Sequence, residues 1–263
     1  MIDQAVLDAG RVRVDVSGPV LSVTLDRPEQ LNAQTPATWR ALADIGRALP
    51  PDVRVVVVRG AGRSFSAGLD RALLTPQGRP DEPSLLELSR RPRPDIEAAI
   101  EQFQAAFTWW STAPVVTVAA VRGNAVGAGF QLALACDLRV LAEDARFAMR
   151  EPSLGLVPDL AGTWPLVAAV GPARALEICA TGRWVSAVEA GQIGLATAVV
   201  PGPNLDAAVA DLVDALLATP EAALRETLML LRAAATRTPS EQRAAERAAQ
   251  ARLLSAMGER PAR

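Results

Sequence analysis

The amino-acid sequence predicts an α/β fold. Two runs rich in β-branched residues, VRVVVVRG at 53–60 and VVTVAAV at 115–121, have the unbroken apolar character of strands buried on both faces of a sheet. Amphipathic stretches at 37–49 and from about 96 to 111 precede and separate these runs and are predicted to be helices. Buried strands separated by helices indicate an α/β core with right-handed crossovers.

The flanking segments extend this pattern. Residues 12–16 and 20–25 are predicted to form a strand pair through the turn Ser17-Gly18-Pro19. Pro36 and the pair Pro50-Pro51 mark the start and the end of the first helix. Strand signals become sparse from residue 163 onward, which predicts an all-helical C-terminal third with helices at 165–180, 187–193, 205–218, 220–236 and 240–257.

The segment from 71 to 95 is irregular and rich in Pro, Arg and acidic residues. We expect a mobile surface loop there, and a tolerated insertion and a lid over a site are equal alternatives for its role. The chain length permits one large domain, or one domain with a small appendage.

Composition narrows the classes of partner. The 27 basic and 29 acidic residues nearly balance, which gives no basic footprint for nucleic acid or an anionic membrane. The start, MIDQAVLDAG, lacks the features of a signal peptide, and no apolar run approaches the roughly 20 residues that span a bilayer. We therefore expect a soluble, cytoplasmic protein. Cys136 and Cys179 lie far apart in apolar helical pattern and are expected to be core residues rather than a disulfide.

Three residue types are absent from the sequence. The chain contains no His, no Tyr and no Lys, so every basic residue is Arg. Without His there is no Ser-His-Asp or Cys-His relay and no zincin site. Without Lys there is no Schiff-base chemistry and no P-loop lysine. An enzyme of this composition must move protons with carboxylates, thiols, water or backbone groups.

Two glycine-containing segments follow the two buried strands. GRSFSAGLD at 62–70 has small residues that allow a bend with outward-pointing N–H groups, and GNAVGAGFQ at 123–131 places Gly127 and Gly129 around a helix start. Two such loops facing each other would supply a pair of backbone donors for an oxyanion. Packing alone is the alternative for either loop, and the third glycine of a dinucleotide-binding fingerprint is missing.

A third segment, FAMREPSLGLVPDLAG at 147–162, carries two carboxylates. Glu151 and Asp159 stand among apolar residues in the sequence. A carboxylate in an apolar pocket has a raised pKa, which a proton shuttle working near neutral pH requires. A solvated surface pair of Glu151 with Arg150 is the alternative.

Five stretches occur in a characteristic order along the chain: RPEQLNA at 27–33, FSAGLD at 65–70, VRGNAVGAGFQLALACDLRV at 121–140, FAMREPSLGLVPDLAGT at 147–163, and ALEICATGRWVSAVEAGQIGLATAVV at 175–200. Taken together they resemble the crotonase, or enoyl-CoA hydratase/isomerase, superfamily. The resemblance implies a spiral of ββα turns with an all-helical C-terminal region. It also implies an acyl-CoA-binding core over 1–200 and a helical oligomerisation region over 201–263 that forms homotrimers or dimers of trimers.

The resemblance implies a site for an acyl-CoA thioester, with coenzyme A carried by the substrate and no further cofactor or metal. The backbone N–H groups of Leu69 and Ala128 would form the oxyanion hole for a thioester enolate. Arginines, Arg27 among them, would meet the phosphates bidentately. The residues expected to bind coenzyme A or the substrate are Arg27, Ala33, Ala67, Gly68, Asp70, Arg71 and Gly127.

Position 131 decides which reaction the resemblance favours. Hydratases of the superfamily use two glutamates; here Gln131 occupies the first position and Glu151 the second. An amide hydrogen-bonds water or substrate but cannot accept a proton. We therefore expect enoyl-CoA isomerisation with Glu151 as proton shuttle and Asp159 as helper, although hydration is the superfamily's commonest activity. A one-glutamate isomerase, a dienoyl-CoA isomerase that uses Asp159, and a protein that binds acyl-CoA without converting it all remain open.

Overall fold

The computed structural model of the chain describes residues 3–79, 82 and 84–258. Within these residues, the main sheet has the strand order β1-β2-β3-β4-β6-β9, in which β1 and β2 are antiparallel and all other neighbours are parallel. Its strands are β1 (Val12–Ser17), β2 (Val20–Leu25), β3 (Val55–Gly60), β4 (Val116–Val121), β6 (Leu138–Ala142) and β9 (Ala198–Val200). A smaller sheet joins β5 (Asn124–Val126), β7 (Arg146–Ala148) and β8 (Val185–Ser186) in that order.

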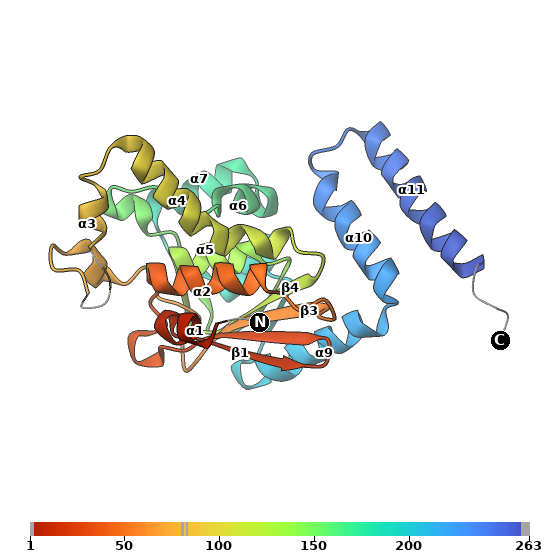
Figure 1. Cartoon of the computed structure of the whole chain (residues 1–263), viewed down its shortest axis with the longest axis horizontal. Helices are drawn as coiled ribbons and strands as arrows, with labels where there is room; N and C mark the ends of the chain where they lie inside the picture. Colours follow the sequence, from red (N-terminus) through yellow and green to blue (C-terminus); the bar gives the residue numbers. More distant parts are fainter. Residues whose placement is uncertain (1–2, 80–81, 83, 259–263) are drawn as a thin grey trace.

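Helices cover both faces of the main sheet. Strand β3 shows the reason, because Val56 and Val58 pack with α2 (Pro36–Arg47) and α4 (Arg93–Thr108), whereas Val55 and Val57 pack with α9 (Leu205–Ala218). Successive side chains of a strand point to opposite faces, so the unbroken valine run is buried on both sides. The other helices are α1 (Gln4–Gly10), α3 (Leu85–Leu88), α5 (Ala128–Ala135), α6 (Thr163–Val170), α7 (Pro172–Thr181), α8 (Ala187–Gln192), α10 (Glu221–Ala234) and α11 (Pro239–Gly258) (Figure 1).

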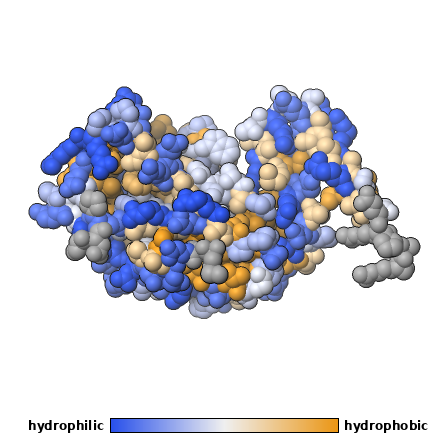
Figure 2. All heavy atoms as spheres, in the orientation of Figure 1, coloured by the Kyte–Doolittle hydropathy of each residue, from blue (hydrophilic) through white to orange (hydrophobic). Residues whose placement is uncertain are grey.

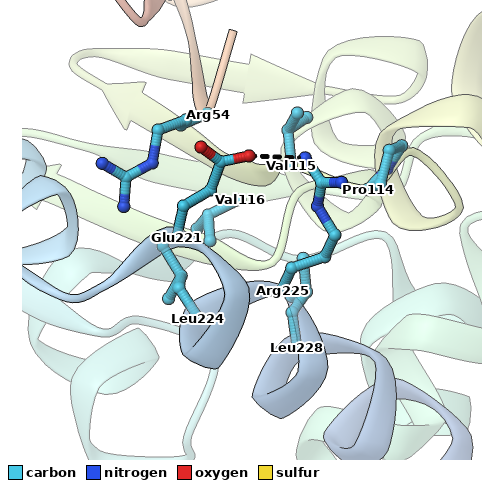
Figure 3. Close-up of a pocket in the computed structure, with 8 residues that line it drawn as sticks. All are labelled: Arg54, Pro114, Val115, Val116, Glu221, Leu224, Arg225 and Leu228. Atoms are coloured by element: carbon cyan, nitrogen blue, oxygen red, sulfur yellow. Dashed lines mark hydrogen bonds and ion pairs between the residues drawn. The ribbon is translucent and has the colours of Figure 1, made fainter. Parts of the chain in front are cut away.

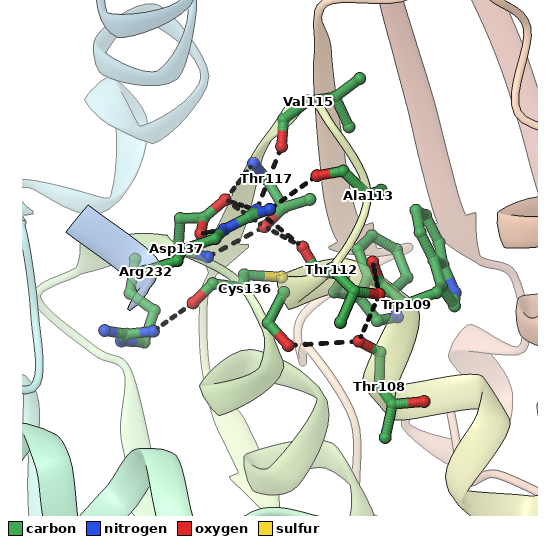
Figure 4. Close-up of polar contacts among 12 residues, drawn as sticks. Thr108, Trp109, Thr112, Ala113, Val115, Thr117, Cys136, Asp137 and Arg232 are labelled. Carbon is green, nitrogen blue, oxygen red and sulfur yellow. Dashed lines mark hydrogen bonds and ion pairs between the residues drawn. The ribbon is translucent and has the colours of Figure 1, made fainter. Parts of the chain in front are cut away.

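Arginines and two leucines, Leu224 and Leu228, attach helix α10 to the body. Arg54, the residue before β3, donates to the Thr219 carbonyl at 2.6 Å in the turn before α10. Residues 114–116 and Arg54 face Glu221, Leu224, Arg225 and Leu228 of α10 across a small pocket (Figure 3). Arg232 of α10 binds both carboxylate oxygens of Asp137, at 2.8 and 2.7 Å, and donates to the Ala113 carbonyl (Figure 4). Helix α11 packs along α10, and a notch separates this pair from the body (Figure 2). Helix α9 thus belongs to the core, whereas α10 and α11 project from it.

Most predicted elements agree with the structure, including the strand pair and both buried strands. The prediction of an all-helical C-terminal third is wrong, because β8 and β9 lie in it; strands of two or three residues carry no readable periodicity. The predicted helix at 165–180 is two helices, separated at Gly171, whose φ is +79°. The segment 71–95 contains a 3-10 helix at 71–74, helix α3 and the start of α4, while its residues 80, 81 and 83 lie outside the described residues.

In the part of the chain that the structure describes, no helix combines the length and apolarity needed to cross a membrane.

Candidate active site

The two glycine-containing loops lie side by side. The Val126 N–H donates to the Ser66 carbonyl at 3.0 Å, which joins the second loop to the first. Gly68 has a φ of +83°, and a Cβ there would come within 2.4 Å of the Val126 carbonyl oxygen and 3.4 Å of the Ala128 nitrogen. A Cβ on Gly129 would lie 2.7 Å from the Cβ of Ser66. Glycine at 68 and 129 therefore allows the two backbones to approach this closely.

The backbone N–H groups of Leu69 and Ala128 belong to these adjoining loops. The Gly68 carbonyl accepts from the Gln34 N–H at 2.7 Å and the Asp70 N–H donates to the Gln34 carbonyl at 2.8 Å, which turns the Leu69 N–H to the opposite side. Ala128 is the first residue of α5, where an N–H has no acceptor within its own helix. Within the described residues neither N–H donates a hydrogen bond, so both donors predicted for the oxyanion hole are free.

Buried side chains hold the first loop. The Ser66 hydroxyl donates to the Asn32 carbonyl at 2.8 Å and accepts from the Gly68 N–H and the Gln34 amide, both at 3.1 Å. The Gln34 side-chain oxygen in turn accepts from the Trp39 indole at 2.9 Å. This network fixes the turn that presents the Leu69 N–H.

Arg27 and Asp70 form a buried ion pair at the end of the first loop. Arg27 Nη1 lies 2.7 Å from Asp70 Oδ2, with the two side chains only 7% and 9% exposed, and Arg79 reaches the same oxygen at 2.8 Å. Burial opposes ionisation of Asp70, but the hydrogen bond from Arg27 leads the contacts that outweigh it and lower the pKa of the carboxyl. The guanidinium of Arg27, which was expected to meet a phosphate, is thus buried and paired with a carboxylate, and its contact with coenzyme A stays a prediction.

The other residues expected to bind coenzyme A lie close together. The Ala67 N–H donates to the Leu31 carbonyl at 2.8 Å, and the Ala33 carbonyl accepts from Arg27 at 3.4 Å, so segments 27–34 and 66–71 run beside each other. Arg71 opens the 3-10 helix that follows and is exposed.

Glu151 lies against the second loop. A Cβ on Gly127 would be 3.1 Å from Glu151 Oε1, and this oxygen accepts from the Gln131 amide at 2.7 Å. The other oxygen, Oε2, is buried and has no hydrogen-bond partner among the described residues. Burial raises the pKa of Glu151 and outweighs the opposing polar contacts with its own backbone N–H and with the Gln131 amide; the negative charge of Asp159 adds to the rise. Among the described residues Glu151 forms no ion pair with Arg150, the alternative partner; Arg150 lies over the Trp184 ring, 5.4 Å from its centroid.

Gln131 is fully buried and links three parts of the site. Its side-chain oxygen accepts from the Leu160 N–H at 2.9 Å and the Gly162 N–H at 3.2 Å, while its amide nitrogen donates to Glu151. These contacts to protein groups are additional to the expected water or substrate partner, which stays a prediction.

Asp159 lies at the start of the same turn and is half-buried. Its carbonyl accepts from the Gln104 amide of α4 at 2.7 Å, and burial raises the pKa of its carboxyl. Cys179 is also close enough for the charge of Glu151 to add to the burial that raises the pKa of its thiol. Among the described residues, no group of three His, Cys, Asp or Glu side chains is placed to hold a metal ion.

Sequence reasoning missed several residues that build this site. Gln34 acts through the side chains of Ser66 and Trp39, while Ser66 and Gln104 donate to backbone carbonyls far away in the sequence. No spacing or residue pattern announces the contacts of Ser66 and Gln104, because the acceptor is a peptide group that every residue carries.

Comparisons with known proteins identify the family. The family model for enoyl-CoA hydratase/isomerase matches residues 15–259. A protein of Thermobifida fusca YX, provisionally named an enoyl-CoA hydratase, was solved in complex with CoA; it is 43% identical, covers 98% of each chain and has a TM-score of 0.91. A second structure of a Thermobifida fusca YX protein with the same provisional name contains acetoacetyl-CoA. It is 44% identical, covers 97% of this chain and 98% of its own, and has a TM-score of 0.91.

Curated relatives agree with these structures. The 1,2-epoxyphenylacetyl-CoA isomerase of Escherichia coli K12 is 34% identical over 71% of this chain and 68% of its own length. A provisionally named enoyl-CoA hydratase of Mycobacterium tuberculosis is 33% identical over 70% of this chain, and the match spans 66% of that relative, just under two thirds. The chain belongs to the enoyl-CoA hydratase/isomerase family, within the crotonase superfamily, and has its α/β fold with a helical C-terminal region.

Proposed function

We propose that this protein is an acyl-CoA enzyme that stabilises a thioester enolate. The thioester oxygen would lie between the N–H groups of Leu69 and Ala128, and Glu151 would carry the proton. One observation carries the proposal: Glu151 Oε2 is buried without a partner in a carboxylate that lies against Gly127, one residue before the free N–H of Ala128. A buried acceptor without a partner lowers the stability of the fold, and beside a pair of N–H donors that can bind an oxyanion it is placed to take up a proton from a substrate.

Enoyl-CoA double-bond isomerisation is the reaction that these residues favour. The Glu151 carboxylate would remove a proton from the carbon next to the thioester, and the electron pair of that bond would move toward the thioester oxygen to form the enolate. Glu151 would return the proton two carbons further along, and the electrons would form the shifted double bond. The step needs no oxidant, reductant or water, and coenzyme A takes part only as a portion of the substrate.

Two-carboxylate hydration is less well supported, because Gln131 is an amide and is enclosed by protein. A carrier that binds acyl-CoA without converting it is the second candidate, since the missing second glutamate is the observation that favours it.

For coenzyme A we propose a path along Ala33, Ala67 and Asp70. Arg71 is better placed than Arg27 to meet a phosphate, because Arg71 is exposed whereas Arg27 is buried and paired with Asp70.

Proton exchange tests this proposal directly. Butyryl-CoA is incubated with the protein in D₂O, and NMR follows the hydrogens next to the carbonyl. We expect exchange with the wild type and a loss of about 10²–10⁴-fold in Glu151→Gln, because that side chain can no longer accept a proton. Glu143→Gln removes an exposed carboxylate and is the matched control.

The outcomes separate the candidates. Unchanged exchange in Glu151→Gln would overturn the assignment of the base. Binding of butyryl-CoA without exchange in the wild type would favour the carrier.

A further inference from the structure

We infer that Gln131 is a positioning residue that fixes the orientation of the Glu151 carboxylate and the position of Asp159, and that its place in the site excludes a water-holding role. The inference rests on the proposed function, which it deepens by assigning which oxygen of Glu151 handles the proton. The evidence for the inference is the set of hydrogen bonds that the buried Gln131 side chain makes.

The acceptor side of the amide holds a turn of the chain. The N–H groups of Leu160 and Gly162 both point at the Gln131 oxygen, and Ala161 between them has a φ of +62°. A left-handed residue between two converging N–H groups is the geometry of a backbone nest, which suits a negatively polarised oxygen. A non-glycine residue with this φ is strained, so the Gln131 oxygen helps to stabilise the turn.

The donor side of the same amide selects one oxygen of Glu151. Gln131 Nε2 donates to Oε1 at 2.7 Å, whereas Oε2 has no partner among the described residues. A hydrogen bond to Oε1 stabilises charge on that oxygen and fixes the plane of the carboxylate. The unpaired Oε2 is therefore the atom that takes up and returns the proton.

The surroundings of Gln131 leave no room for a catalytic water there. The residue is 0% exposed, and a Cβ on Gly162 would lie 2.6 Å from Gln131 Cγ. A carboxylate at 131 would still accept from the two N–H groups, but its other oxygen would face Glu151 Oε1 with no proton between them. Two carboxylates at hydrogen-bond distance cannot both ionise, so an amide keeps Glu151 free to titrate alone.

A second glutamine reinforces the turn from the opposite side. Gln104 of α4 donates to the Asp159 carbonyl at 2.7 Å, one residue before the N–H that Gln131 accepts. Asp159 is thus held between two amides, from α4 and from α5, and its charge acts on Glu151 at a fixed distance.

Two near-isosteric variants test the inference. Gln131→Glu retains an acceptor for the turn but replaces the neutral amide donor with an acid that must share one proton with Glu151, and Gln131→Met removes both functions. The Glu151 carboxyl is followed by ¹³C NMR during pH titration, identified by its loss in Glu151→Gln, and butyryl-CoA exchange in D₂O is measured over the same pH range. Asp159 and Cys179 are the titratable groups whose charges couple to Glu151, so their signals are followed in the same series.

We expect Gln131→Glu to keep a melting temperature near that of the wild type while Glu151 titrates at higher pH, with the acid limb of exchange moving with it. Gln131→Met should lower exchange by about 10²-fold, because the carboxylate loses its orientation, with the affinity for butyryl-CoA little changed. Gln242→Met is the control, since the Gln242 amide likewise donates to a glutamate carboxylate, that of Glu246 at 3.5 Å, and to the Leu230 carbonyl at 3.3 Å, in the C-terminal helices α10 and α11.

An unchanged titration of Glu151 in Gln131→Glu would overturn the inference, whether or not the protein exchanges protons. Hydration of crotonyl-CoA gained by Gln131→Glu with that titration unmoved would also overturn it, because position 131 would then hold water. If the wild type binds butyryl-CoA without exchange, the proposed function fails, and the NMR titration still decides the role of Gln131.

Discussion

Asp70 and Glu151 are both shielded carboxylates beside the paired loops, and they differ in their donors. Asp70 ends the first loop and receives two guanidinium groups, from Arg27 and Arg79, which together with the Ala72 N–H outweigh its burial and lower its pKa. Glu151 lies against the second loop and receives no guanidinium group among the described residues, only the Gln131 amide and nearby backbone N–H groups, so burial dominates and raises its pKa. The donors, rather than burial alone, thus separate a carboxylate that stabilises the fold from one that can exchange a proton.

The largest expected effect comes from removing the cation of the structural pair. Arg27→Met leaves Asp70 buried with Arg79 as its only guanidinium partner among the described residues, and should lower the free energy of unfolding by about 3–5 kcal/mol. Urea denaturation followed by tryptophan fluorescence measures this loss. Arg79→Met is the comparison, since that side chain is 26% exposed and should matter less. Equal losses in the two variants would contradict the contrast between buried and exposed partners.

A smaller effect is expected on the Glu151 side. Asp159→Asn removes the charge that adds to the raised pKa of Glu151, so the acid limb of butyryl-CoA exchange should move to lower pH. The exchange rate should fall by about 10²-fold if Asp159 assists the transfer. NMR exchange rates across pH measure both, with Asp95→Asn, an exposed aspartate of α4, as the control. If Asp159→Asn exchanged at the wild-type rate and the acid limb of its pH profile did not move, Asp159 would have no role in the proton transfer.

The smallest expected effect is a difference between Glu151 and Asp70 in how their contributions to stability change with pH. The pKa of Glu151 is raised in the folded state, so its stabilising contribution is present below the usual 4.5 and is lost as pH rises through the folded value. The wild type should therefore lose stability relative to Glu151→Gln as pH rises, by a fraction of the Arg27→Met loss. Asp70 has a lowered pKa, so its contribution is present above the usual 3.8 and is lost as pH falls.

Urea denaturation of the wild type, Glu151→Gln and Asp70→Asn over a pH series measures both trends. The wild type's advantage over Asp70→Asn should shrink on acidification, the reverse of the trend for Glu151→Gln. Differences that stay constant with pH would show that neither carboxyl changes its pKa on folding.

Sequence periodicity was sufficient for the long buried elements and insufficient for the short ones. The valine run of β3 announces a strand buried on both faces, whereas Val185–Ser186 of β8 is too short to show any period. The small sheet that carries β5 and β7 beside the site was not predicted for that reason.

The candidate site divides in a similar way. Its loops, Glu151 and Asp159 were visible in the sequence because their residue types are unusual for their surroundings. The partners of Gln131 were not visible, since Leu160 and Gly162 contribute backbone N–H groups and the left-handed φ belongs to an ordinary alanine at 161. The Arg27–Asp70 pair was hidden by the 43 residues that separate its members.

The nest at 160–162 that holds the Gln131 oxygen would accept a carboxylate oxygen equally well. Glutamine and glutamate codons differ at a single base. Under the proposed function, one point mutation in the gene would therefore exchange a one-base site for a pair of coupled acids without rebuilding the turn, which would make position 131 a short evolutionary step between two proton arrangements on one backbone.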